Sequence, residues 1–149
     1  MQSTGLSLAS AESLTGGMVG STLTAVPHAS GVYEGGLVAY ASEVKHRWLG
    51  VPRGPVVTAP AAQAMARGAA RFFGTDVAIA TTGVAGPDPQ DGRRPGTVFV
   101  GAYLRLSGGE ATHTAELMLS GARDAVRVGT VVWLLRFLLE RLPEQSIGE

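Results

Sequence analysis

The sequence predicts an α/β fold, with one open sheet covered by helices on both faces. Three observations predict it. Short apolar segments typical of strands alternate with helical segments along the chain. Two strand-like segments near the C-terminus are joined by the tight turn Ser107-Gly108-Gly109-Glu110, so the sheet is expected to be mixed, not purely parallel. No internal repeat, low-complexity tract or linker interrupts residues 1–149, which predicts a single domain.

The first half of the chain predicts two strands and two helices. A short apolar strand at 6–11 leads into a helix at 18–26. The segment 32–41 is rich in Val, Tyr and Gly and is expected to be a strand. Its Gly35-Gly36 pair predicts a bulge or the close approach of another group. Ser42 is expected as the N-cap of a short helix that ends at Gly50.

The second half continues the alternation. Thr58 is expected to cap a helix that runs to Phe73, and a strand follows at 77–81. The segment 83–96 contains four glycines and three prolines, which predicts a loop long enough to be functional. Two strands at 97–106 and 111–119 form the hairpin, and the apolar periodicity of 122–142 predicts the last helix.

Composition excludes several function classes. The 12 Lys and Arg balance 12 Asp and Glu, which argues against a general nucleic-acid binder. The absence of cysteine excludes disulfides, thiolate metal sites and cysteine nucleophiles, and the three histidines lack the spacing of a helical zinc motif. No metal or cofactor is therefore expected, although a Ser-His-Asp triad stays open.

The N-terminal residues and the apolar segments suggest a cytoplasmic location. Residues 1–11 have no basic segment followed by a long apolar core, so a secretory signal is not expected. No apolar run reaches about 18 residues, so no membrane span is expected.

Small polar residues and glycines gather after the first predicted strand, in Ala11-Glu12-Ser13-Leu14-Thr15-Gly16-Gly17. Free backbone amides at such a strand-to-helix turn can hold a phosphate or an oxyanion. Glycines also serve this kind of turn for geometric reasons alone, and both interpretations stay open.

A second group consists of Ser30, Tyr40 and Lys45. Lys45 falls in the first turn of a predicted helix, where the helix dipole disfavours a cation. If the side chain is also buried, both effects favour the neutral amine, which could take a proton from a serine. The alternative is an ordinary surface lysine. Arg123, at the start of the last predicted helix, could hold a phosphate or simply pair with Asp124.

Five motifs together resemble one known family. Besides Ala11–Gly17, they are Gly35-Gly36-Leu37-Val38-Ala39-Tyr40 followed by Lys45, Thr82-Gly83-Val84-Ala85-Gly86-Pro87, Gly96-Thr97-Val98 and Arg123-Asp124-Ala125-Val126-Arg127. In this order they resemble the C-terminal domain of the competence/damage-inducible protein CinA, which also occurs alone as nicotinamide-nucleotide amidase. The chain departs from the family pattern at Ser42, usually asparagine, and in the 88–95 loop.

The resemblance implies a three-layer α/β/α sandwich whose mixed, mostly parallel sheet carries a C-terminal hairpin. It also implies a homo-oligomer, a dimer or higher, that hydrolyses the carboxamide of nicotinamide mononucleotide to nicotinate mononucleotide and ammonia without a metal. On this interpretation the partner is a small pyridine nucleotide, and no nucleic acid or membrane is involved.

The resemblance also suggests roles for individual residues. Lys45 is expected as the base and Tyr40 as a proton relay. Ser30 is the first choice of nucleophile, because it precedes the Tyr40 and Lys45 block, and Ser13 is the alternative. The expected substrate-binding residues are Thr15, Gly16, Gly17, Thr82, Gly83, Ala85 and Arg123. The competing interpretation is a non-catalytic nucleotide-binding or oligomeric partner domain in a DNA-damage or competence response.

Overall fold

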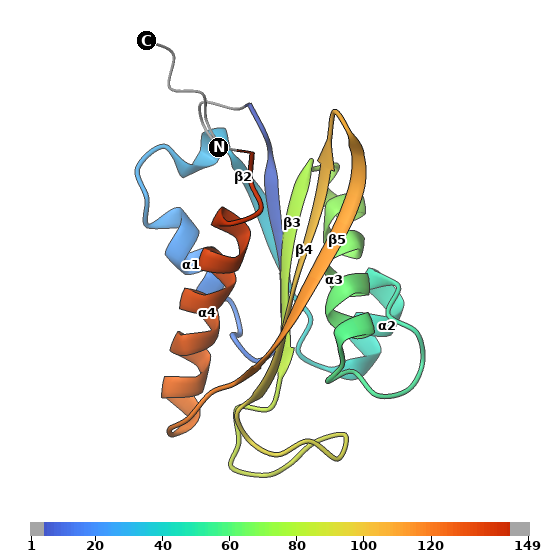
Figure 1. Cartoon of the computed structure of the whole chain (residues 1–149), viewed down its shortest axis with the longest axis vertical. Coiled ribbons are helices and arrows are strands. Elements are labelled where there is room, and N and C mark those ends of the chain that lie inside the picture. The colour runs from blue at the N-terminus through green and yellow to red at the C-terminus, as the bar shows by residue number, and fades with distance from the viewer. Residues whose placement is uncertain (1–4, 144–149) are drawn as a thin grey trace.

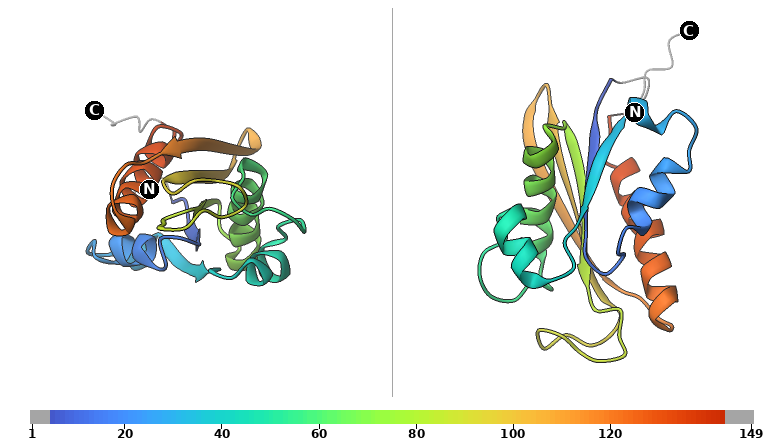
Figure 2. Two further views of the ribbon diagram at one scale, coloured as in Figure 1. Left: turned by 90° about the horizontal axis from the view of Figure 1, so that it is seen from below. Right: turned by 180° about the vertical axis from the view of Figure 1, so that it is seen from behind.

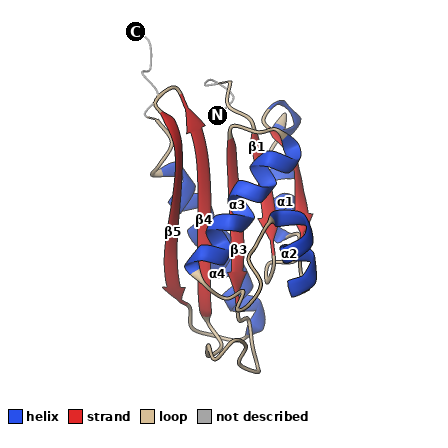
Figure 3. Cartoon of the chain, turned by 90° about the vertical axis from the view of Figure 1, so that its right-hand side faces the viewer, coloured by secondary structure: helices blue, strands red, loops and turns tan. Residues whose placement is uncertain are grey.

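The computed structural model, which describes residues 5–143, contains one five-stranded sheet (Figure 1). The strands lie side by side in the order β2-β1-β3-β4-β5 (Figure 3). Pairing is parallel between β1 and both β2 and β3, and antiparallel from β3 through β4 to β5. The predicted mixed sheet with a C-terminal hairpin is confirmed. The strands are β1 (Leu8–Glu12), β2 (Tyr33–Val38), β3 (Val77–Gly83), β4 (Thr97–Leu106) and β5 (Gly109–Met118).

Helices cover both faces of the sheet, so the molecule has three layers. The view along the strands shows α1 and α4 on one face and α2 and α3 on the other (Figure 2). A short 3-10 helix, η2 (Ala29–Gly31), precedes β2. No helix among the described residues is long and apolar enough to cross a membrane. The helices are α1 (Met18–Thr24), α2 (Ser42–Leu49), α3 (Ala59–Phe73) and α4 (Arg123–Leu139).

Each face of the sheet has its own core. The core between the sheet and the helices α1 and α4 contains larger side chains than the core on the other face. In it, Leu134 and Phe137 of α4 pack with Ile79 and Val100 of the sheet. The other core consists largely of alanines, from α3 and from the strands it covers, and these small side chains let that helix lie close to the sheet. Burial of these apolar surfaces is the main stabilising contribution to the fold.

Local signals placed several elements correctly. The Thr58 hydroxyl accepts a hydrogen bond from Ala61 N at 3.2 Å, as its N-cap role predicts. The close approach expected at the glycine pair is also confirmed: a Cβ on Gly35 would lie 2.7 Å from Phe73, and one on Gly36 would collide with the Ser10 hydroxyl. Only glycine fits at these two positions.

The start of α2 differs from the prediction. Ala41, not Ser42, is the N-cap, because the amides of Val44 and Lys45 both donate to the Ala41 carbonyl. The preceding strand ends earlier than predicted, at Val38. Tyr40 therefore lies in the short connector between β2 and α2, where its side chain is 60% exposed.

Candidate active site

The candidate site lies at the edge of the sheet where most strands end. Strands β1, β2, β3 and β5 share one direction, since β4 is antiparallel to both β3 and β5. Their carboxyl ends lead into Ser13, Tyr40, the loop 84–96 and Arg123, respectively. Side chains 110 residues apart in sequence are thereby gathered at one edge.

The order of the strands also reverses here. From β1 the chain continues to β2, on one side of the β1–β3 pair, whereas from β3 it continues to β4, on the other side. Open α/β sheets bind ligands at such a switch point, outside the carboxyl ends of the strands. Ser13 follows β1 and Gly83 ends β3, so both lie at the switch point.

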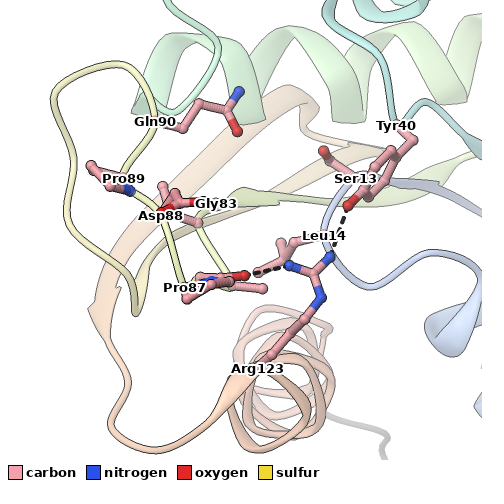
Figure 4. Close-up of a pocket in the computed structure, with 12 residues that line it drawn as sticks. Ser13, Leu14, Tyr40, Gly83, Pro87, Asp88, Pro89, Gln90 and Arg123 are labelled. Carbon is pink, nitrogen blue, oxygen red and sulfur yellow. Dashed lines mark hydrogen bonds between the residues drawn. The ribbon is translucent and has the colours of Figure 1, made fainter.

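A cleft of about 420 Å³ opens here. Figure 4 shows the 84–96 loop as one wall, Ser13 and Tyr40 as the other, and Arg123 across one end. Clefts of about 300–1,000 Å³ suit small-molecule ligands. The lining residues are Ser13, Leu14, Tyr40, Gly83, Val84, Ala85, Gly86, Pro87, Asp88, Pro89, Gln90 and Arg123.

Arg123 connects the two walls of the cleft. Its Nη1 donates a hydrogen bond to the Gly86 carbonyl at 2.6 Å, and its Nη2 donates to the Tyr40 hydroxyl oxygen at 2.8 Å (Figure 4). A guanidinium has five N–H groups, so donors are left for a ligand. The predicted Tyr40 and Arg123 are brought together by the fold.

Lys45 is the only lysine of the chain, and its side chain is 1% exposed. Its Nζ donates to the Tyr40 carbonyl at 2.9 Å. Burial lowers the pKa of this amine to about 8, and the negative charge of Asp91 partly opposes that shift. A surface role for Lys45 is therefore excluded, and about a tenth of the amine is neutral at pH 7, rising to about half at pH 8.

Ser13 presents a free hydroxyl at the cleft. Its backbone amide donates to the Thr81 carbonyl at 3.0 Å, which fixes the main chain beside β3. Its Oγ, in a residue that is only 7% exposed, has no hydrogen-bond partner among residues 5–143. The amides of Leu14, Ala85 and Gly86, which line the same cleft, also donate to none of the described residues. One cleft is thus lined by a serine hydroxyl and by residues with unused backbone N–H groups, the kinds of group that can act as a nucleophile and as oxyanion donors.

The glycine turn after Ser13 is already occupied by a side chain. The buried Glu12 carboxylate accepts hydrogen bonds from the amides of Gly17 at 3.0 Å, Val19 at 3.0 Å and Gly20 at 2.9 Å. The partial positive charge at the start of α1 is therefore neutralised from inside the protein. The amides of Gly17, Val19 and Gly20 therefore do not form the phosphate or oxyanion site expected at this turn, and within Ala11–Gly17 the cleft-lining residue with an unused amide is Leu14.

The predicted ligand residues divide into two groups. Gly83, Ala85 and Arg123 line the cleft. Outside its lining, the Thr15 hydroxyl pairs with that of Thr81, and the Thr82 hydroxyl donates to the Val56 carbonyl at 2.7 Å. The other two, Gly16 and Gly17, have the positive φ values of 58° and 101° that the turn requires.

Ser30 lies at the opposite end of the strands, where β2 begins. It belongs to η2, which precedes β2, whereas Tyr40 and Lys45 follow β2. The six residues of β2 alone span roughly 20 Å at the usual strand rise. Ser30 lines a separate cavity with Pro27, His28 and Tyr33. The structure does not bring this first-choice nucleophile to the lysine, and Ser13 is the candidate serine that lines the cleft.

Sequence reasoning missed two acidic residues that build the site. Glu12 organises the turn that carries Ser13, and Asp91 accepts hydrogen bonds from Val56 N at 2.7 Å and Val57 N at 3.0 Å. Glu12 could have been suspected, because an acid beside free helix-start amides often binds them. No group of three or more metal-binding side chains occurs within the described part of the chain.

Comparison with known proteins identifies the family. The model of the CinA C-terminal domain matches residues 1–142. A Geobacillus kaustophilus protein named as competence-damage inducible is 46% identical over 144 residues, 93% of this chain and 34% of that protein. A CinA-like protein of Geobacter sulfurreducens is 43% identical over the same shares. This chain thus spans about a third of the curated relatives it matches.

Solved structures agree with the sequence matches. The Escherichia coli member of the competence-damaged protein (CinA) superfamily superposes with a TM-score of 0.88 at 31% identity, covering 95% of this chain and 83% of that one. The Enterobacter cloacae member gives a TM-score of 0.88 at 32% identity, covering 95% and 85%. The chain therefore belongs to the CinA C-terminal domain family.

Proposed function

We propose that the chain is an amidase that hydrolyses the carboxamide of nicotinamide mononucleotide to nicotinate mononucleotide and ammonia, with Ser13 as nucleophile and Lys45 as base. One observation carries the proposal. A serine whose hydroxyl has no partner within the described part of the chain lines the same cleft as Tyr40, and the Tyr40 carbonyl binds a buried lysine of lowered pKa. Serine next to a neutral lysine is an established arrangement for acyl transfer.

The first half of the reaction forms an acyl-enzyme. The Lys45 amine accepts the proton of the Ser13 hydroxyl as Oγ bonds to the carboxamide carbon. The Lys45 Nζ is hydrogen-bonded to the Tyr40 carbonyl before substrate enters, so this transfer needs the amine to turn toward Ser13 or to act through the Tyr40 hydroxyl. Amides of Leu14, Ala85 and Gly86 are the donors for the oxyanion.

The second half releases both products. The carbon–nitrogen bond breaks and nitrogen leaves as ammonia, with its added proton returned from Lys45 or Tyr40. The Tyr40 hydroxyl oxygen already accepts from Arg123, so its own proton is directed elsewhere and is available for this step. Water, with its proton taken by the same base, then attacks the acyl carbon. Nicotinate mononucleotide leaves, and the Ser13 hydroxyl is restored.

Substrate choice depends on Arg123. Two of its N–H groups bind protein oxygens, which orients the guanidinium at the end of the cleft and leaves others for the phosphate of a nucleotide. The cleft volume suits a mononucleotide. The nicotinamide identity of the base is supported by the family resemblance.

Ammonia release from nicotinamide mononucleotide tests the proposal, with free nicotinamide as the matched control. We expect release from the nucleotide at a rate at least tenfold above that from nicotinamide, because the control lacks both the ribose and the phosphate that Arg123 is proposed to bind. Absence of ammonia from both would contradict the amidase function.

A binding role is the second candidate, since the relatives are named for competence and damage induction. A non-catalytic domain would bind the nucleotide and release no ammonia. Calorimetric binding without turnover would therefore favour this alternative.

A further inference from the structure

The loop 84–96, which forms one wall of the cleft, is tied to a neighbouring segment by one side chain. Asp91 Oδ2 accepts hydrogen bonds from the amides of both Val56 and Val57, at 2.7 and 3.0 Å. A small turn presents the carboxylate: Gln90 and Arg93 bond each other's main chain at 3.1 and 2.8 Å, and Asp91 has a φ of 51°. The residue is exposed, but its carboxylate is directed at buried main chain.

The segment 51–57 that Asp91 binds is in turn held to the helix of Lys45. The Val51 amide donates to the Lys45 carbonyl at 3.3 Å, and the Val51 carbonyl bonds His46 Nδ1 at 2.9 Å. The Thr82 hydroxyl holds the Val56 carbonyl from the sheet. A continuous set of hydrogen bonds therefore connects the cleft loop, the 51–57 segment and α2.

Asp91 also acts on Lys45 through its charge. It is the side chain whose charge raises the pKa of Lys45, against the stronger lowering by burial. The other charged side chains on the elements packed around Lys45 bind other groups or have no resolved effect on its pKa. Glu43 pairs with Arg53, His46 binds the Val51 carbonyl, and on α3 Arg67 bonds Thr112 while Arg71 reaches toward Gly50. Arg47 on α2 adds no resolved effect on Lys45.

We propose that Asp91 is a positioning residue that holds the 84–96 loop against the cleft and keeps a negative charge within range of the Lys45 amine. Loop position and the charge of Lys45 are thereby coupled. When the loop moves away, Asp91 leaves the amides of Val56 and Val57 and its field at Lys45 weakens. The coupling itself does not depend on the proposed function. Only its effect on catalysis rests on that function, in which Lys45 is the base.

A titration of Lys45 tests the coupling independently of catalysis. Because Lys45 is the only lysine, protein labelled with ¹³C-lysine gives one Cε resonance whose shift reports this amine alone. Asp91→Asn keeps an oxygen that can accept from Val56 and Val57 but removes the charge. We expect its Lys45 titration midpoint below that of the parent protein. Glu116→Gln, which removes one charge and the contact of Arg93 in the same loop, should leave the midpoint in place.

Anchoring is tested by a second variant. Asp91→Ala removes charge and hydrogen bonds together, so trypsin should cleave after Arg93 several times faster than in the parent or in Glu116→Gln. If the enzyme is active, Asp91→Ala should raise KM more than it lowers kcat, since the wall of the cleft is displaced. A folded Asp91→Asn protein with an unshifted Lys45 midpoint, or an Asp91→Ala protein with unchanged cleavage, would overturn the inference. Lack of ammonia release by the parent would remove the proposed function and leave both tests intact.

Discussion

Arg123 Nη2 donates a hydrogen bond to the Tyr40 hydroxyl oxygen at 2.8 Å, although the two residues are 83 positions apart in the sequence. The contact joins the start of α4 to the connector between β2 and α2. Because the Tyr40 oxygen accepts this bond, its hydroxyl hydrogen points away from Arg123. The bond also holds the guanidinium at the end of the cleft. Both consequences lead to tests.

Replacing Arg123 by lysine should weaken binding of the phosphorylated substrate. Lysine keeps the charge but loses the planar fork, and a lost charge-assisted hydrogen bond corresponds to about 1.5–3 kcal/mol. We expect KM for nicotinamide mononucleotide to rise by about 10- to 100-fold. Steady-state kinetics with nicotinamide riboside, which lacks the phosphate, should show a much smaller difference. Arg136→Lys, on an exposed position of the same helix, serves as the control. Equal KM increases for both substrates would contradict a phosphate role.

Removing the Tyr40 hydroxyl should slow the chemical step. Positioned proton donors contribute roughly 10²–10⁴ in rate, and Tyr40→Phe loses both the donor and the contact with Arg123. We expect kcat to fall by about 100-fold. The melting temperature should hardly change, because the side chain is largely exposed. A Tyr40→Phe protein with parental kcat would remove Tyr40 from the mechanism.

Activity should follow the protonation of Lys45. With a pKa of about 8, the neutral amine increases as pH rises, so kcat/KM should climb about tenfold per unit below this value and level off above it. A pH–rate profile between pH 6 and 9.5 measures this directly. A profile that is flat below pH 8 would exclude Lys45 as the base.

The same lysine should destabilise the folded protein at neutral pH. Its pKa is lowered from 10.5 to about 8 on folding, so the cost of burying the charged amine is fully present below pH 8. This cost disappears as pH rises through 10.5. Lys45→Met should therefore melt a few degrees above the parent at pH 7, with the difference shrinking between pH 8 and 10.5. Thermal unfolding at several pH values checks the trend, and a lower melting temperature at pH 7 would contradict it.

Glu12 should matter for stability more than for substrate contact. Glu12→Gln keeps the shape of the side chain but weakens three charge-assisted hydrogen bonds to the amides of Gly17, Val19 and Gly20, a loss of about 2–3 kcal/mol. The melting temperature should fall by about 5–10 °C. Glu34→Gln, on the exposed side of β2, is the matched control and should stay near the parent. Equal melting temperatures for both variants would show that the carboxylate does not support the turn.

Local features of the fold were predictable from sequence because neighbouring residues determine them. The Thr58 cap and the hairpin turn after Leu106 each follow from backbone geometry over a few residues. The glycine pair predicted a close approach at Gly35, but not that Phe73 would make it. The grouping of Tyr40, Lys45 and Arg123 came from the family resemblance and not from spacing alone. The fold brings Tyr40 and Arg123 to one cleft, and Lys45 binds the Tyr40 carbonyl, whereas their catalytic and binding roles stay predictions.

The choice of serine depended on topology. Ser30 is ten positions from Tyr40, yet β2 lies between them and separates them by the length of the strand. Ser13 is farther away in sequence, and the parallel pairing of β1 with β2 places it at the same edge as Tyr40. The contacts of Asp91 with Val56 and Val57 also escaped prediction, because they link two loops through main-chain amides that any residue carries.

The most direct test of the proposed amidase is ammonia release from nicotinamide mononucleotide by Ser13→Ala beside the parent and Ser30→Ala. Ser13 supplies the attacking oxygen in the proposed mechanism, so its removal should lower kcat by at least about 10³-fold, as expected for loss of a nucleophile. Ser30→Ala, altered at the opposite end of the strands, should stay within about twofold of the parent. A folded Ser13→Ala protein that releases ammonia at the parental rate would contradict the mechanism.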